Sequence, residues 1–359
     1  MATYGTWALR AGMAGAAALA VVAAFAQPST GAASAATSWT IFGKNAFAGD
    51  DAIQDVTVAP TGSTWGGGYR SGPDADDSVL PVVQHWVNGR FQNVALPAAW
   101  RGRVEVIDAS SSKNVWAFGD DFTSPYAARW NGTRWTKQAL PQTFAVSDAE
   151  VFSPTNVWAV SSSGGAQRWN GSAWRASSVP IRATAIDGKN AQLWAVGSRN
   201  GADGRSQPAA ARWDGSVWRA VNPPAVALPG GESEAFFTDV TMVSATNVWA
   251  VGGIHTEGGD TPPVSTPILA HYVGGKWKVW TNGAGIAFNR VVQDGQGGIH
   301  IMQGQWNPTV LHGRNGVWTR TPLPRTPGFD VAAFSLERNP VTGTLWTSGF
   351  HSPEGDPDD

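Results

Sequence analysis

A short apolar string containing tryptophan recurs along the chain and constrains the fold more than any other feature. Its clear copies lie at 114–118, 156–160, 192–196 and 247–251, with weaker copies around Trp65, His300 and Trp346. The mean spacing of about 47 residues falls within the ~40–50 residues typical of β-propeller blades. Seven copies therefore predict seven blades.

A second signature follows the string in several repeats. Asn-Gly or Asp-Gly lies between two tryptophans at 130–135, 169–174 and 213–218. Both turn positions favour positive φ, so this pattern predicts a tight β-hairpin. With a short alternating run before each string, every repeat predicts four antiparallel strands.

The two ends of the chain predict how the ring closes. Residues 38–42 resemble a fourth strand with nothing before it, and the last repeat lacks an obvious third strand. We expect the N-terminal strand to complete the last blade, which would remove an open sheet edge. The predicted fold class is all-β, a seven-bladed β-propeller of four-stranded antiparallel blades.

The N-terminus has the order of a secretory signal peptide. Arg10 precedes an Ala-rich apolar stretch at 11–26, and small residues follow at 33–35. An uncleaved anchor is the alternative, but this stretch is short for a span of ~20 residues. We therefore expect a signal peptide at 1–36, one propeller domain at 37–350, an acidic tail at 351–359, and a secreted or cell-surface protein without a membrane span after cleavage.

Composition excludes several classes of function. The 25 basic and 27 acidic side chains nearly balance, so a nucleic-acid partner is not expected. Cysteine is absent, which excludes disulfides, thiolate metal sites and a cysteine nucleophile. Most of the 20 tryptophans recur at repeat positions and are predicted to pack between blades. His85, His271 and His312 occupy equivalent third-strand positions, which indicates one repeated structural slot and no metal site.

The two signatures resemble those of secreted β-propellers from high-GC Gram-positive bacteria, which repeat Val-Trp-Ala-Val-Gly before a Trp-Asn/Asp-Gly-x-x-Trp hairpin. The resemblance extends from Trp39 to about Phe350. The chain is also broadly similar to galactose-oxidase-like, Kelch-like and sialidase-like propellers. The resemblance implies the fold and secretion, but no single activity, because propellers support unrelated functions.

Two enzymatic activities of those relatives are not expected. The copper-radical chemistry of galactose oxidase needs a cysteine-crosslinked tyrosine, which a chain without cysteine cannot form. The Arg-Ile-Pro segment and the Ser-x-Asp-x-Gly-x-x-Trp box of sialidases are absent. A carbohydrate-active hydrolase or lyase stays an alternative if loop carboxylates converge in space, with candidates at Asp74, Asp76, Asp77, Asp120, Asp121 and Glu257.

The main functional prediction is an extracellular binding module, monomeric, that holds a glycan, a cell-wall component or a protein. In a propeller, the loops after the second and fourth strands emerge on one face, where function usually lies. Arginines there would grip the ligand by forked hydrogen bonds while aromatic side chains stack on it. The candidate binding residues are Tyr69, Trp100, Arg101, Arg103, Arg182, Arg290, Trp306, Arg325 and Phe329. A purely structural surface protein is a third possibility.

No cofactor is expected apart from a possible calcium ion. Hard cations take clustered carboxylates, and the candidate ligands are Asp74, Asp76 and Asp77 in one loop, or His255, Glu257 and Asp260 in another.

Overall fold

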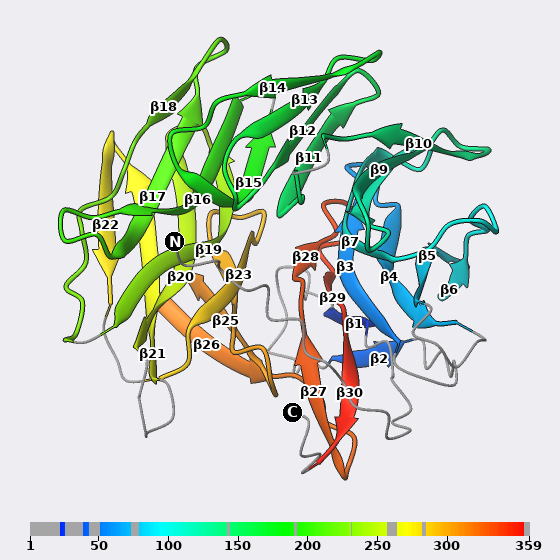
Figure 1. Cartoon of the computed structure of the whole chain (residues 1–359). Coiled ribbons are helices and arrows are strands. Elements are labelled where there is room, and N and C mark those ends of the chain that lie inside the picture. The colour runs from blue at the N-terminus through cyan, green and yellow to red at the C-terminus, as the bar shows by residue number, and fades with distance from the viewer. Residues whose placement is uncertain are drawn as a thin grey trace.

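The computed structural model describes residues 22–25, 39–42, 51–72, 79–141, 144–189, 192–230, 232–256, 264–281 and 285–354. Six regular blades, each a sheet of four consecutive antiparallel strands, follow one another around a ring (Figure 1). Their strands are β3–β6 (Ala52–Val58, Thr64–Ser71, Val79–Val87, Arg90–Asn93), β7–β10 (Arg103–Ser111, Asn114–Asp120, Pro125–Trp130, Trp135–Ala139), β11–β14 (Asp148–Ser153, Asn156–Val160, Ala166–Trp169, Trp174–Ser177), β15–β18 (Arg182–Lys189, Gln192–Asn200, Ser206–Trp213, Trp218–Ala220), β19–β22 (Ser233–Ser244, Asn247–Thr256, Val264–Val273, Lys276–Trp280) and β23–β26 (Phe288–Gln293, Ile299–Gln303, Thr309–Arg314, Val317–Pro322).

A composite closing sheet occupies the remaining sector of the ring. Its strand order is β28 (Glu337–Arg338), β29 (Leu345–Thr347), β1 (Val22–Phe25) and β2 (Thr40–Phe42). A two-stranded ladder of β27 (Phe329–Ala333) and β30 (Gly349–Pro353) adjoins it in the chain. The first strands of successive blades contact one another, and β28 contacts both β23 and β3. The ring is therefore closed by strands from both ends of the chain.

The prediction of seven equivalent blades is wrong, because only six are regular. Up to residue 354, where the described residues end, the last repeat supplies a first and a second strand but no third one, and its sheet takes the missing strands from the N-terminal segment. The predicted fourth strand does join this sheet as β2, but its ladder partner is β1. Residues 22–25, within the predicted signal peptide, fill the third position. At the other end, β30 extends to Pro353, past the predicted start of the tail.

The string tryptophans form the core between blades, as predicted. Trp116 is fully buried and packs edge-on against Trp169 and Trp174 of the next blade, with ring centroids 5.5 and 5.4 Å apart. Trp158 packs in the same way against the hairpin tryptophans of β17 and β18. Each Asn-Gly or Asp-Gly hairpin thus presents its aromatic pair to the preceding blade, which explains the shared period of the two signatures.

The histidines occupy one structural slot, which confirms the prediction. His85 stacks on Trp65 at 4.0 Å and His271 stacks on Trp249 at 3.7 Å between ring centroids. His312 stacks on His300, which replaces the string tryptophan in the sixth blade. In the second blade an arginine takes the slot over the string tryptophan. The slot is therefore used for packing between the second and third strands.

The glycine that ends the string lies where the backbone of the first strand comes close to that of the second. The first strand of each regular blade has a register shift in its pairing with the second, as between Val104 and Val106 in β7. A Cβ atom on Gly119 would lie 1.9 Å from the carbonyl oxygen of Arg103, and one on Gly349 would lie 1.8 Å from that of Ala332. Only glycine fits where the first strand comes this near. Gly349, in the β27–β30 ladder that adjoins the closing sheet, therefore meets the same close approach, although that ladder has no bulge.

Candidate functional site

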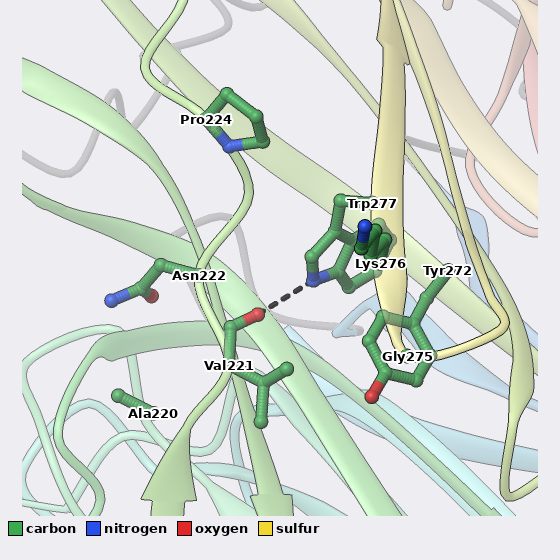
Figure 2. A pocket seen from close by; sticks show the side chains of 8 residues that line it. All are labelled: Ala220, Val221, Asn222, Pro224, Tyr272, Gly275, Lys276 and Trp277. Carbon is green, nitrogen blue, oxygen red and sulfur yellow. Dashed lines mark hydrogen bonds between the residues drawn. The ribbon is translucent and has the colours of Figure 1, made fainter.

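An outer groove of about 500 Å³ lies between the fourth and fifth blades (Figure 2). One wall is the chain that leaves β18, and the other is the hairpin that joins β21 to β22. The lining residues are Ala220, Val221, Asn222, Pro224, Tyr272, Gly275, Lys276 and Trp277. One of its walls is therefore a connection after a fourth strand, but none of the predicted binding residues lines the groove.

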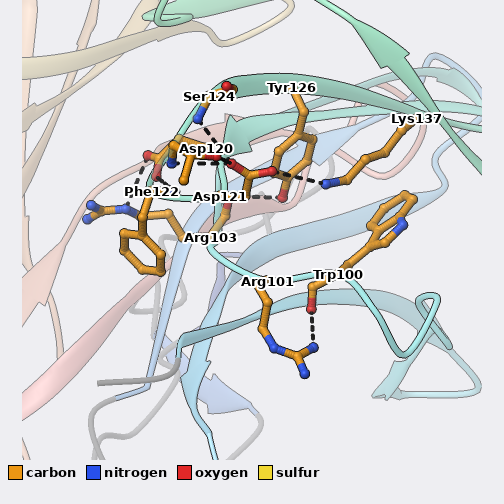
Figure 3. Close-up of polar contacts among 10 residues, drawn as sticks. Trp100, Arg101, Arg103, Asp120, Asp121, Phe122, Ser124, Tyr126 and Lys137 are labelled. Carbon is orange, nitrogen blue, oxygen red and sulfur yellow. Dashed lines mark hydrogen bonds and ion pairs between the residues drawn. The ribbon is translucent and has the colours of Figure 1, made fainter. Parts of the chain in front are cut away.

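A second candidate is the rim cluster, where the loop before β7 meets the β8–β9 loop (Figure 3). Its members come from all four strands of the second blade and the two loops, and they are Trp100, Arg101, Arg103, Asp120, Asp121, Phe122, Ser124, Tyr126 and Lys137. Three of the predicted binding residues, Trp100, Arg101 and Arg103, are therefore brought together here.

Phe122 is the most unusual side chain of the rim cluster. It is 55% exposed and its φ is 67°, a backbone conformation that bulky residues rarely adopt. The Asp120 carboxylate accepts a hydrogen bond from the Phe122 N–H at 2.9 Å. Asp121 Oδ1 accepts from Thr123 Oγ1 at 2.6 Å and from the Ser124 N–H at 3.0 Å. Two aspartates therefore hold a strained turn that presents an aromatic ring to solvent.

Cations lie against the aromatic rings of the cluster. The Arg103 guanidinium is 5.7 Å from the centroid of the Phe122 ring. Lys137 Nζ lies 4.4 Å from the ring of Tyr126 and 5.3 Å from that of Trp100. Burial raises the pKa of Tyr126, and its hydroxyl donates to the Arg103 carbonyl at 3.0 Å. These contacts fix the rings beside Phe122 in one arrangement.

The carboxylates of the cluster are engaged with neighbours. Arg103 Nε lies 3.5 Å from Asp120 Oδ2 and 3.6 Å from Glu105 Oε1. Burial, followed by the charge of Asp120, raises the pKa of Glu105. The hydrogen bond from the Thr123 hydroxyl lowers the pKa of Asp121, whose Oδ2 lies 3.7 Å from Lys137 Nζ. Asp120 and Asp121 thus hold the turn, which gives no support to a catalytic pair within this loop.

The connection to the first blade lies directly against the turn. Gly102, with φ 87°, donates its N–H to the Val79 carbonyl at 2.9 Å. A Cβ atom on it would lie 1.8 Å from the Asp120 carbonyl oxygen. Arg101 is exposed, and its Nη1 donates to the carbonyl of Trp100 at 3.0 Å. The close approach at Gly102 brings Arg101 and Arg103 to the same rim as Phe122.

The other predicted binding residues lie around the ring and form no common site. Arg182 occupies the position of Arg103 in the fourth blade and donates to Asn200 Oδ1 at 2.9 Å. Arg290 lies within β23, next to a bulge. Burial raises the pKa values of Asp55 and Asp239, two carboxylates on first strands that face the central channel, and the charge of Arg290 opposes that rise. Arg290 therefore belongs to the channel wall, away from the loop where the sequence placed it.

The remaining predicted residues have local surroundings. Trp306 packs edge-on against Phe350 at 5.4 Å between centroids, and Phe329 lies 6.4 Å from the ring of His351. Tyr69 is half-buried within β4, and Arg325 is exposed between β26 and β27. Nothing in these contacts joins the four side chains to the rim cluster.

The predicted calcium ligands Asp74, Asp76 and Asp77 lie outside the described residues, as do Glu257 and Asp260. Within the described part of the chain, no group of three or more His, Asp or Glu side chains could hold a metal ion. His255 stacks on Phe236 with centroids 5.0 Å apart.

A belt of carboxylates around the central channel was not predicted. Its members on the first strands are Asp55, Asp108, Asp148, Glu150, Asp187 and Asp239, and each accepts from a backbone N–H of the next blade. Asp148 Oδ2, for example, accepts from the Ile186 N–H at 2.8 Å. Burial raises the pKa of Asp55 to about 7 and those of Asp108 and Asp239 to about 6. The belt links neighbouring blades, and its only sequence signal is an acid that recurs in apolar first strands.

Comparisons with known proteins identify the fold alone. No protein-family model matches the chain, and no curated protein matches it. Among solved structures, a streptogramin B lyase is similar with a TM-score of 0.55 and 12% identity, over 84% of this chain and 93% of that one. YCF48 bound to D1 peptide gives a TM-score of 0.52 and 12% identity, over 83% and 93%. The RRP9 WD40 repeats give 0.52 and 8%, over 84% and 95%.

At these identities the neighbours establish a β-propeller and nothing about activity. Among the described residues, no helix is long and apolar enough to cross a lipid bilayer.

Proposed function

We propose that the protein is a secreted binding module whose rim cluster holds a segment of another polypeptide. The observation that carries this proposal is Phe122, an aromatic ring 55% exposed on a turn with φ 67°. Backbone strain persists only where the surroundings enforce it, and such strain gathers at functional sites. Here Asp120 and Asp121 enforce the turn through their hydrogen bonds.

The chemistry around Phe122 suits a polypeptide. Binding hot spots of proteins are rich in aromatic side chains and arginine, and Phe122 lies beside Arg103 with the exposed Arg101 nearby. Because the turn is already held in place, little conformational entropy is lost when a partner binds. One propeller of similar fold, YCF48, is described as bound to D1 peptide. That complex supports peptide binding by a propeller but does not identify the ligand of this chain.

A peptide-library selection tests the proposal. Peptides selected on the wild-type protein are measured by calorimetry against wild type and Phe122→Ala. A hot-spot aromatic contributes about 2 kcal/mol, so we expect affinity to fall about 30-fold in the variant. Val341→Ala is the matched control, since Val341 is 67% exposed on the turn between β28 and β29. Equal affinity of wild type and Phe122→Ala would overturn the assignment of the rim cluster.

Secretion belongs to the same proposal and rests on the N-terminal pattern at 1–36. Edman sequencing of protein recovered from culture medium should start near residue 37. The secreted form would then lack β1, the strand that pairs with both β2 and β29 in the closing sheet. Recovery of the protein only in the cell fraction, with residue 1 or 2 at its N-terminus, would contradict it.

A further inference from the structure

The outer groove has a rigid aromatic wall. Tyr272 and Trp277 pack on the buried Trp194 at 4.7 and 5.8 Å between centroids, and both also line the groove. The Trp277 indole N–H donates to the Val221 carbonyl at 2.6 Å, as Figure 2 shows. This bond fixes the orientation of the ring, whereas the equivalent indole nitrogens of Trp174 and Trp218 are buried without a hydrogen-bond partner.

The opposite wall exists because the connection between β18 and β19 is long. Val226 and Leu228 of this connection pack on the core of the fourth and fifth blades. Gln207 holds it further, since its Nε2 donates to the Val226 carbonyl at 3.2 Å and its Oε1 accepts from the Val226 N–H at 2.9 Å. The connection is therefore anchored, and the groove is preformed.

The polar groups of the groove are mostly donors. Asn222 Oδ1 accepts from the Ala210 N–H at 3.2 Å, which leaves the Asn222 amide N–H groups for a ligand. The Tyr272 hydroxyl and the exposed Lys276 ammonium also line the groove. No carboxylate is among the lining residues. A ligand that fits is therefore rich in acceptors and negatively charged.

The geometry points to a binding site for an acidic saccharide, a sugar chain that carries uronic acid. The weakly positive C–H face of a sugar ring suits the negative face of an aromatic ring such as Trp277. Hydroxyl and ring oxygens would accept from Asn222 and Tyr272, and the uronate carboxylate would pair with Lys276. A volume of about 500 Å³ lies within the range of small-ligand sites and accommodates a short oligosaccharide. This site is separate from the rim cluster and does not depend on the proposed function.

The test is a titration of the full chain with a uronic acid trisaccharide and with a neutral trisaccharide, followed by NMR of the tryptophan indole protons. We expect the Trp277 resonance, assigned with Trp277→Phe, to shift with the uronide. Lys276→Ala should weaken uronide binding about fivefold, since one exposed ion pair is lost. Asn222→Asp keeps the acceptor for Ala210 but adds a repelling charge, and it should weaken binding further.

Two controls separate this site from other causes. Lys278→Ala removes an exposed lysine of the same strand that does not line the groove, and it should leave uronide affinity unchanged. Phe122→Ala should also leave it unchanged, so failure of the rim proposal is distinguishable from failure of this one. An indole spectrum that does not respond to the uronide, or equal affinity of wild type and Asn222→Asp, would overturn the assignment.

Discussion

The second blade and the closing sheet reach the same architecture by different routes. In the second blade, β7 to β10 follow one another and pair through short local turns. In the closing sheet, β28 and β29 from the C-terminal end pair with β1 and β2 from the N-terminal end. The ladder of β29 and β1 joins only Thr347, Trp346 and Leu345 to Ala23, Ala24 and Phe25. A regular blade needs only local contacts, whereas closure requires the ends of a long chain to meet, which has a larger entropic cost.

The largest expected effect is in the core of the regular blades. Trp116→Ala should lower the free energy of unfolding by about 3–5 kcal/mol, because Trp116 is fully buried between two hairpin tryptophans. Trp39→Ala should cost less, because Trp39 precedes the short strand β2 at the edge of the closing sheet. Urea denaturation of both variants measures the difference. Equal losses would mean that the closing sheet is as firmly held as a regular blade.

The two glycines that end the string, Gly119 and Gly349, give a matched pair with a smaller effect. Gly119→Ala should destabilise the protein by about 1–3 kcal/mol, since the new Cβ would overlap the Arg103 carbonyl oxygen. Gly349→Ala meets the same overlap with Ala332, but β27 and β30 form a ladder of two strands that can yield. We expect a smaller loss for Gly349→Ala, measured as the shift in thermal midpoint. A larger fall in thermal midpoint for Gly349→Ala than for Gly119→Ala would show that the β27–β30 ladder yields less than a regular blade.

The smallest effect concerns the carboxylate belt and pH. The pKa of Asp55 is about 7 in the folded protein against 3.8 for an ordinary aspartate, and those of Asp108 and Asp239 are about 6. Below pH 3.8 the Asp55 carboxyl holds its proton in both the folded and the unfolded protein. Above it the unfolded chain releases the proton first, so stability falls as pH rises toward about 7.

Between pH 5 and pH 8 the free energy of unfolding should therefore fall by at least about 1.4 kcal/mol, the equivalent of one pKa unit. Asp239→Asn should reduce this slope. Asp214→Asn is the control, because hydrogen bonds from Val217 and Ser216 lower the pKa of the exposed Asp214 and move its titration below this range. A slope that Asp239→Asn leaves unchanged would show that the belt does not titrate in this interval.

Much of the fold followed from local patterns. The string and the hairpin signature each lie within a few residues, so the strands of the second to fifth blades and the burial of Trp116 could be predicted. The histidine slot could also be predicted, because His85 and His271 hold the same place in the repeat. The count of regular blades could not, because the missing third strand of the last repeat was replaced from a distant segment.

The candidate sites also combine residues that local patterns predicted with residues whose role depends on tertiary contacts. Trp100, Arg101 and Arg103 were predicted at the loop face, but Phe122 was overlooked because its exposure and φ depend on hydrogen bonds from Asp120 and Asp121. An aromatic residue within a polar loop between two strands was the one available signal. The outer groove had no signal, since it depends on where a long connection packs against a neighbouring blade.

By itself, the sequence determined the four-stranded blade repeat, the packing of its tryptophans between blades and the absence of cysteine chemistry. Those properties depend on residue types at short spacing, where side-chain period and turn preference act directly. The tertiary structure alone decided the composite closing sheet, the carboxylate belt, the strained turn at Phe122 and the groove beside Trp277. Each of these arises from contacts between segments far apart in the chain, and short-range pattern carries no information about which distant backbone will supply the partner.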